Sequence, residues 1–383
     1  MTITHSINSI KKPSKILLVS GSFGTASALL VVYNRLIERN FKVIVVSSSI
    51  ASKLFKSHQV KCIDINDSFN YDIASKIVEK HCPNLIIVGA GGNNNIEKLF
   101  IDTARIFHID SFALVDNWCL IAHRFMKDQH SSSTPYILPD VIGVPDANCR
   151  NQLLSDANFR NVKIMISGMP HVESTRKNVF NKTKNYKKLL FTSSGISSGN
   201  IVITFFSAPV ESTPLQKNNV GYTEESIITS LIESVINSPA AQKQKILLLI
   251  KPHPSFEYSG ISSLIERFKC HNLSIRLIPN MENEDIFLLS NAVFGMTTTA
   301  LYEAAICGKI TYSLQIGLKV KSDYCNFFIS NKYFDCIFKK KDLDNAILRI
   351  LNRERIKVYS GNHVNKSDKI VPFLISQFDL CSY

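Results

Sequence analysis

Residues 16–25 read ILLVSGSFGT, a short apolar run that ends in a glycine-containing turn, and a helical pattern follows over 25–39. Further apolar runs cover 43–46, 60–63, 85–88, 112–115, 141–144 and 162–166, with helical patterns such as 73–81, 95–107 and 147–158 between them. Uninterrupted apolar runs that alternate with helices are typical of parallel strands buried on both faces. Residues 1–172 are therefore predicted to form one doubly wound domain.

The same alternation restarts further along the chain. Strand-like runs cover 189–191, 201–206, 246–250, 273–277, 292–294 and 310–312, and helical patterns cover 224–236, 261–268, 284–289, 299–307 and 343–351. Residues 189–383 are predicted to be a second domain, with a C-terminal helix over 370–378 that could pack on either domain. Residues 173–188 are rich in Lys, Asn and Thr and are predicted to be a linker.

The predicted fold class is thus α/β, with two doubly wound, Rossmann-like domains facing a central cleft. Ligands of such sheets bind beyond the carboxyl ends of the strands. The side chains that follow the strands are therefore the candidates for function.

Charge and composition narrow the classes of partner. The 383 residues include 44 Lys and Arg and 31 Asp and Glu, a net charge of +13. No RNA-binding or helix-turn-helix signature is present, so no nucleic-acid partner is expected. The positive charge is expected to help bind anionic donors, acidic glycans or an inner-membrane surface. No apolar run has the ~20 residues that span a bilayer, and the nine cysteines contain no Cys-x-x-Cys pair. A cytoplasmic protein is predicted, with a peripheral position on the inner membrane left open and no metal site.

Two glycine-containing loops follow strands of the first domain. Gly21, Ser22 and Gly24 precede a helix, whose N-terminus favours negative charge, and glycines let the backbone approach a ligand. The loop has neither the G-x-G-x-x-G pattern nor the lysine of a P-loop. Gly91 lies in the second loop, GAGGN over 89–93. Each loop is either a binding loop or a tight turn without a ligand.

A carboxylate and the only tryptophan follow the run 112–115. Asp116 could act as general base on a sugar hydroxyl, and the indole of Trp118 could stack on a sugar ring. His123 lies just beyond them. The alternative is that Asp116 caps a helix and Trp118 packs in the core.

In the second domain, the sequence KPHP directly follows the apolar run 246–250. The two prolines fix an extended loop, which would hold the imidazole of His253 in one direction. A fixed histidine can bind a phosphate or protonate a leaving oxygen. Lys251 precedes it as a second cationic candidate.

Three threonines follow the run 292–294 and open a helix. The hydroxyls of Thr297, Thr298 and Thr299, together with free backbone N–H groups, make a candidate anion site. Glu303 lies one turn further on and could accept hydrogen bonds from ribose hydroxyls. The alternative is a threonine cap followed by an acidic residue, a common helix start.

Together these clusters resemble the bacterial GT-B glycosyltransferases of capsule and lipopolysaccharide assembly. Sialyltransferase-like and Kdo-transferase-like members carry an HP motif and a Ser/Thr motif, which His253-Pro254 and Thr297–Thr299 match here. Segments 205–209, FFSAP, and 221–224, GYTE, also resemble surface-polysaccharide members. The Asp/Glu-Asp/Glu-Gly motif of some sialyltransferases is absent.

The resemblance implies transfer of a sugar from a CMP- or UDP-linked donor to a hydroxyl of a glycan, a lipid-linked molecule or a small acceptor. It implies that the donor is bound by Lys251, His253, Thr297, Thr298, Thr299 and Glu303. Asp116 is the first candidate for the base, His123 the second, and His253 assists departure of the phosphate. The acceptor side would be formed by Gly21, Ser22, Gly24, Gly91, Trp118 and His123. Transfer would be metal-independent, with no cofactor besides the nucleotide-sugar substrate.

Two other functions fit the same architecture. UDP-N-acetylglucosamine 2-epimerases share it, but their Gly-Thr-Arg-Pro-Glu start and their glycine-rich acidic helix start are absent here. An epimerase-like enzyme is therefore ranked second among enzymes. A non-catalytic nucleotide-sugar-binding protein is the alternative from another class.

Overall fold

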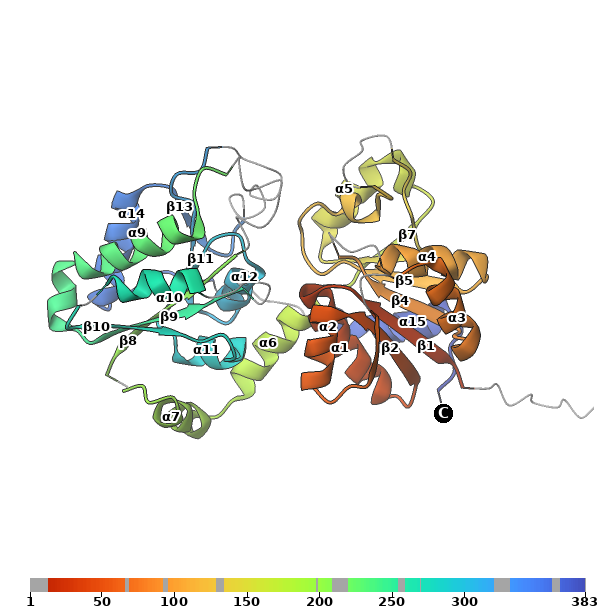
Figure 1. The fold of residues 1–383 in the computed structure, drawn as a ribbon, viewed down its shortest axis with the longest axis horizontal. Coiled ribbons are helices and arrows are strands. Elements are labelled where there is room, and N and C mark those ends of the chain that lie inside the picture. The colour runs from red at the N-terminus through yellow and green to blue at the C-terminus, as the bar shows by residue number, and fades with distance from the viewer. Residues whose placement is uncertain are drawn as a thin grey trace, which may run out of the picture. The chain divides into compact units, whose positions relative to one another are not determined.

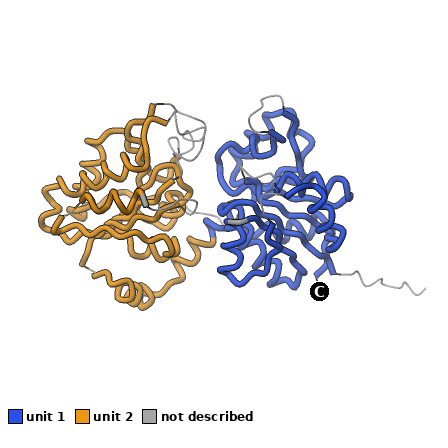
Figure 2. The backbone as a smooth tube through the Cα atoms, viewed as in Figure 1, with its two compact units in different colours: residues 1–173, 365–383 blue, residues 174–364 orange. Residues whose placement is uncertain are grey.

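The computed structural model describes residues 13–65, 69–91, 96–128, 134–197, 199–208, 220–253, 259–268, 270–319, 331–359 and 366–382. They form two compact units, blue and orange in Figure 2. The first unit is Met1–Glu173 with Asn365–Tyr383, and the second is Ser174–Val364. Each is an α/β unit built on a parallel sheet, which confirms the prediction of two Rossmann-like domains.

The first unit contains a seven-stranded sheet in the order β3-β2-β1-β4-β5-β6-β7, in which all neighbouring strands are parallel. Its strands are β1 (Lys15–Ser20), β2 (Lys42–Ser48), β3 (Cys62–Ile65), β4 (Leu85–Gly89), β5 (Asp110–Leu114), β6 (Val141–Val144) and β7 (Lys163–Ile166). The strand order reverses between β1 and β4. Ligands of doubly wound sheets bind at such a switch point, beyond the carboxyl ends of the strands.

Helices cover both faces of this sheet (Figure 1). One buried cluster includes α1 (Phe23–Ile37), α2 (Ser49–Ser57) and α15 (Ile370–Gln377), and the other includes α3 (Tyr71–His81), α4 (Ile96–Ile106) and α5 (Ala147–Ser155). Ile16 and Leu18 of β1 join the first cluster, whereas Leu17 and Val19 join the second. This two-residue period means that both faces are buried, which explains why the strand is apolar throughout.

The second unit repeats the pattern with six parallel strands in the order β10-β9-β8-β11-β12-β13. Its strands are β8 (Ile201–Phe206), β9 (Ile246–Lys251), β10 (Leu273–Leu277), β11 (Ala292–Gly295), β12 (Ile310–Leu314) and β13 (Asp335–Ile337). Its helices include α7 (Lys184–Ser193), α9 (Glu224–Ile236), α10 (Ser259–Glu266), α11 (Asn283–Leu289), α12 (Thr299–Ile306) and α14 (Lys340–Leu351). The switch point of this sheet lies between β8 and β11.

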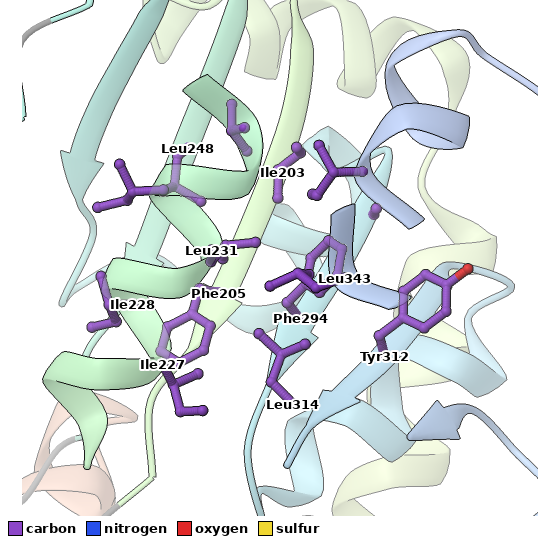
Figure 3. Close-up of a cluster of buried hydrophobic side chains, with 14 of the residues drawn as sticks. Ile203, Phe205, Ile227, Ile228, Leu231, Leu248, Phe294, Tyr312, Leu314 and Leu343 are labelled. Carbon is purple, nitrogen blue, oxygen red and sulfur yellow. The ribbon is translucent and has the colours of Figure 1, made fainter. Parts of the chain in front are cut away.

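Figure 3 shows the core on one face of the second sheet. Strand residues Ile203, Phe205, Leu248 and Phe294 belong to one buried cluster with the helix residues Ile227, Ile228, Leu231 and Leu343. The rings of Phe294 and Tyr312 stack with centroids 5.4 Å apart. Among the described residues, no helix combines the length and the apolar character that crossing a membrane requires.

The expected linker over 173–188 is helical instead. It lies in α6 (Pro170–Asn181) and α7, and the strand expected over 189–191 is also part of α7. Thr183 caps α7, its hydroxyl accepting a hydrogen bond from the backbone N–H of Tyr186 at 3.2 Å. Polar composition suggested a linker, but no glycine or proline interrupts 173–193, and lysines are good helix formers.

The C-terminal helix belongs to the first unit and not to a domain over 189–383. Leu374 of α15 is buried in the cluster that includes α1. The carboxylate of Glu173 accepts hydrogen bonds from the backbone N–H and the hydroxyl of Ser367, at 2.9 and 2.6 Å. Arg35 forms an ion pair with Asp368 at 2.7 Å. These contacts join residues far apart in sequence, so local patterns could not assign the helix to a unit.

Candidate functional site

In the second unit, the strands β9, β8 and β11 lie side by side. Lys251 at the end of β9 and Gly295 at the end of β11 are both register partners of Phe206 at the end of β8. His253 lies two residues beyond Lys251, and Thr297 lies two residues beyond Gly295. Because neighbouring strands are about 4.7–4.9 Å apart, these two segments leave the same edge of the sheet with one strand between them.

The ammonium group of Lys251 donates hydrogen bonds to the backbone carbonyls of Pro279 and Met281, at 2.6 and 2.7 Å. It thereby ties the end of β9 to the loop before α11, and desolvation by burial lowers its pKa. Burial also lowers the pKa of His253, to about 4. The imidazole is therefore neutral at pH 7, with one N–H to donate. Pro254 lies outside the described residues.

The threonine run begins directly after β11 and continues into α12. Thr298 is the N-cap of this helix, and its hydroxyl accepts a hydrogen bond from the backbone N–H of Ala300 at 3.4 Å. Thr297 is buried, whereas Thr299 is partly exposed. A cap explains one of the three threonines, and anion binding by this helix start stays a prediction.

Glu303 is buried in α12 and is 5% exposed. Its carboxyl accepts a hydrogen bond from the side-chain amide of Asn283 at 3.1 Å. Burial raises its pKa to about 7, although the bond from Asn283 opposes that rise. Near neutral pH the group is thus present both as carboxylate and as neutral acid, so it can accept or donate a hydrogen bond.

Ser207 was not predicted as a site residue, although it directly follows β8 at the switch point. Its hydroxyl donates a hydrogen bond to Glu224 in the first turn of α9. Both residues lie in the segments that carry the resemblance, 205–209 and 221–224. Position after the central strand of the sheet is the signal that could have found Ser207.

In the first unit, the loops after β1 and β4 meet at the switch point. The backbone N–H of Gly21 donates to Oε1 of Glu97 at 2.8 Å. Ser22 caps α1 through a capping box. A Cβ at Gly91 would lie 3.2 Å from Oε1 of Glu97 and 3.4 Å from the hydroxyl of Ser22. The structure thus brings these predicted residues together, and the rest of the second loop, 92–95, lies outside the described residues.

Asp116 follows β5 at the same edge and is 7% exposed. Its Oδ1 forms an ion pair with Arg124 at 2.7 Å and accepts a hydrogen bond from the amide of Asn117 at 3.1 Å. The next helix, η1 (Ala122–Phe125), has Ile121 at its N-cap position, so Asp116 is not a helix cap. Gly24 lies so close that a Cβ there would be 2.4 Å from Oδ2 of Asp116.

Arg124 forms hydrogen bonds with several residues at this edge of the sheet. Besides Asp116, its guanidinium donates hydrogen bonds to the carbonyls of Cys119 and Ala90 and to the side chain of Asn117. It thereby connects the loop after β4 with the loop after β5. Arg124 was not predicted as a site residue, because a lone arginine in a loop gives no signal until its partners are known.

The other two predicted residues of this segment differ in exposure. The indole N–H of Trp118 donates to Oδ2 of Asp146, the N-cap of α5, at 2.8 Å, and the ring packs against the core. This agrees with the packed-tryptophan alternative, and stacking on a sugar stays a prediction. His123 is exposed.

Two titratable groups of the first unit were missed. Oε2 of Glu97 and Nδ1 of His171 are buried and have no hydrogen-bond partner within the described residues. Burial, assisted by the charge of Asp116, raises the pKa of Glu97 to about 8, and burial lowers that of His171 to about 4. An acidic residue in a first helical turn is common, so the sequence did not distinguish Glu97. Across the described ranges, no group of three or more His, Cys, Asp or Glu side chains is arranged to hold a metal ion.

No family model and no curated protein matches the chain. Solved structures match it over almost its whole length. A candidate UDP-N-acetylglucosamine 2-epimerase from Listeria monocytogenes has a TM-score of 0.67 at 12% identity, covering 96% of this chain and 97% of that chain. The UDP-N-acetylglucosamine 2-epimerase from Neisseria meningitidis, bound to UDP-N-acetylglucosamine, has a TM-score of 0.63 at 14% identity, covering 94% and 100%. A glycosyltransferase from Rickettsia africae has a TM-score of 0.52 at 10% identity, covering 96% and 99%.

The chain has the GT-B fold. At identities of 10 to 14% the likeness concerns the fold alone. One fold hosts several chemistries, so the activity has to be argued from the residues at the strand ends.

Proposed function

We propose that the chain is a nucleotide-sugar-dependent glycosyltransferase. It transfers a sugar from a CMP- or UDP-linked donor to a hydroxyl of a glycan, a lipid-linked molecule or a small acceptor in surface-polysaccharide or glycoconjugate synthesis. Nucleotide-sugar use is supported by the solved structure that contains UDP-N-acetylglucosamine. Transfer is supported by the motif resemblance and by the likeness to a glycosyltransferase.

The observation that carries the proposal is the strand register of the second unit. Lys251 and Gly295 pair with the same residue, Phe206, so His253 and Thr297 leave one edge of the sheet beside its switch point. An imidazole, hydroxyls and a helix N-terminus then converge where doubly wound sheets bind nucleotides.

These groups suit a departing phosphate. The neutral imidazole of His253 donates an N–H to a phosphate oxygen, and Thr297, Thr299 and the N-terminus of α12 add further donors. Negative charge grows on that oxygen as the bond to the sugar breaks, so fixed donors lower the barrier. Lys251 positions the end of β9, and Glu303 binds ribose hydroxyls.

The first unit provides the base. Asp116 takes the proton of the acceptor hydroxyl while the acceptor oxygen bonds to C1 of the sugar. The electron pair of the broken C1–O bond leaves with the nucleotide phosphate. Arg124 orients the carboxylate of Asp116, and the exposed His123 is the second candidate for the base. The acceptor is bound by Gly21, Ser22, Gly24, Gly91 and Trp118.

Epimerisation at C2 of a UDP-sugar is the second candidate, because the two most similar structures reported above are an epimerase and a candidate epimerase. NMR of the products separates the two reactions. A transferase yields free nucleotide and a new glycosidic bond, whereas an epimerase yields an intact nucleotide-sugar with inverted C2.

The proposal is tested by measuring UDP and CMP binding by calorimetry and nucleotide release from their sugar conjugates. His253→Ala removes a donor to an anion and should weaken binding about 10- to 100-fold. His271→Ala is the matched control, since this histidine is exposed in the same unit. Equal nucleotide binding by both variants and the wild type would refute the assignment of His253 to the donor site. Tight binding without turnover of any donor would favour a non-catalytic binding protein.

A further inference from the structure

Among the described residues, only one of the two carboxyl oxygens of Glu97 has a hydrogen-bond partner. The residue lies in the first turn of α4 and is 2% exposed. Its Oε1 accepts the N–H of Gly21 at 2.8 Å, whereas Oε2 is buried without a hydrogen-bond partner among the described residues. Buried polar atoms are satisfied in the great majority of cases. The unsatisfied oxygen therefore points to a partner that comes from outside the chain.

Burial and one neighbouring negative charge favour the neutral form of Glu97 at pH 7. Burial is the main cause that raises its pKa to about 8, and the negative charge of Asp116 adds to it. Lys98, the next residue of α4, opposes the rise, but a backbone carbonyl binds its ammonium group. Arg124 is already paired with Asp116, and His171 on α6 interacts with Asp116. The β1–α1 loop contributes a backbone N–H and no charged side chain.

We propose that Glu97 is a hydrogen-bond donor to a sugar bound by the first unit. Gly21 fixes Oε1, and a proton on Oε2 is donated to a hydroxyl or carbonyl oxygen of that sugar. The inference rests on the proposed function only for the identity of the ligand.

The neighbouring groups favour a sugar over an anion. Asp116 and Arg124 compensate each other in a buried ion pair at 2.7 Å, so the pair offers no uncompensated positive charge to a phosphate. A neutral donor next to an ionised acceptor matches a molecule whose hydroxyls both donate and accept. Two nearby carboxyls in opposite protonation states are the usual way to divide such roles.

A pH dependence follows from this assignment. Above pH 8 Glu97 loses its proton, and the site loses a donor and gains a second anion. Sugar-dependent turnover should then fall about tenfold for each further pH unit, as for one titrating group. Glu97→Gln keeps an N–H donor and cannot ionise, so its turnover should not show the roughly tenfold fall that the wild type shows by pH 9.

Infrared spectroscopy of the full chain tests the assignment without relying on turnover. A neutral carboxyl band should be present at pH 7, disappear above pH 8, be missing in Glu97→Gln, and shift when N-acetylglucosamine is added. Glu79→Gln removes an exposed glutamate and serves as the control.

Each outcome decides a different point. Absence of a Glu97-dependent band at pH 7 would overturn the neutral donor. A band that neither N-acetylglucosamine nor UDP-N-acetylglucosamine shifts would overturn the sugar contact. A band that shifts in a protein without any transfer or epimerisation would support the contact while the proposed function fails.

A second, independent observation concerns the surface formed by residues 176–191. This segment contains six basic residues and no acidic residue. Helix α7 has no buried residue, and large apolar side chains are exposed next to the lysines, with Phe180 at 61% and Leu189 at 69%. Lys182 is paired with Asp285 at 2.6 Å. In the described part of the chain, no ion pair involves the other five basic residues of the segment.

We infer that this basic surface docks on an anionic phospholipid bilayer. Exposed lysines attract acidic headgroups, and exposed Phe180 and Leu189 can enter the interface, which is the combination that interfacial helices use. The charge of the segment excludes a basic partner, and its exposed apolar side chains distinguish it from a purely solvated helix.

Co-sedimentation with vesicles tests this inference. The full chain should bind phosphatidylglycerol-containing vesicles and not phosphatidylcholine vesicles. Replacing Lys184, Lys187 and Lys188 by glutamine should weaken binding about a hundredfold, and Leu189→Ser should weaken it further. The same change at Lys53, Lys76 and Lys80, exposed lysines of the first unit, is the control. Equal loss in the control, or binding to DNA but not to vesicles, would overturn the inference.

Discussion

At the carboxyl edge of the sheet in each unit, burial favours the neutral form of one glutamate and of one histidine. Burial raises the pKa of Glu97 to about 8 and that of Glu303 to about 7. It lowers the pKa of His171 and of His253 to about 4. The two edges differ in their other side chains. The first unit has the buried ion pair of Asp116 and Arg124, and the second unit has the threonines 297–299.

This difference divides the chemistry between two sheets of similar strand order. A carboxylate held by an arginine can accept a proton, whereas neutral hydroxyls and an imidazole N–H are donors for an anion. The fold determines where side chains gather, and residue type at the strand ends determines what they bind. The comparison can be tested one group at a time.

The largest effect is expected from Arg124→Ala in the first unit. The change leaves Asp116 buried without its cation, which typically costs about 3–5 kcal/mol. Hydrogen exchange of β4 and β5 amides should show the loss, while β8 and β9 keep their protection. Arg124→Ala combined with Asp116→Asn should recover part of the stability, because the uncompensated charge is gone. Unchanged protection in the single variant would contradict the role of the ion pair.

The next effect is a pH dependence in the second unit. The pKa of His253 is about 4 in the folded chain, against 6.5 for the free side chain. Because the folded value is the lower one, this group contributes stability above pH 6.5, which is lost as the pH falls through 4. The difference between these two pKa values corresponds to at most about 3 kcal/mol. His253→Gln should remove this loss from the acid unfolding curve of the second unit, and an unaltered curve would refute the burial argument.

A third change returns to the first unit. A Cβ at Gly24 would lie 2.4 Å from Oδ2 of Asp116, so Gly24→Ala must displace the carboxylate that Arg124 holds. Such overpacking typically costs about 1–3 kcal/mol, and hydrogen exchange of β5 measures it. Gly260→Ala is the matched control, because a Cβ there meets nothing within 4 Å. A loss of the same size in both variants would mean that crowding at Asp116 is not the cause.

The sequence predicted both sheets because strand runs such as 246–250 and 292–294 are apolar and flanked by helical periods. It predicted the loops at the strand ends for the same reason. It did not predict α7, because the polar composition of that segment suggested a linker. It also did not predict the unit to which α15 belongs, because that depends on contacts of Glu173 and Arg35 with residues distant in sequence. It also missed Glu97 and His171, since their shifted pKa values arise from burial by residues distant in sequence.

The smallest effects separate helix capping from ligand binding at the two switch points. Ser22 and Thr298 are N-caps, so Ser22→Ala and Thr298→Ala should each destabilise their helices by about 1 kcal/mol. Thr299 accepts no capping bond, so Thr299→Ala should leave the exchange of α12 amides unchanged while it weakens UDP binding. If Thr299→Ala affects neither measurement, the threonines only cap α12. The second edge would then have no donor site that distinguishes it from the first edge. If it weakens UDP binding while Ser22→Ala does not, the threonines belong to the donor side and the contrast between the edges stands.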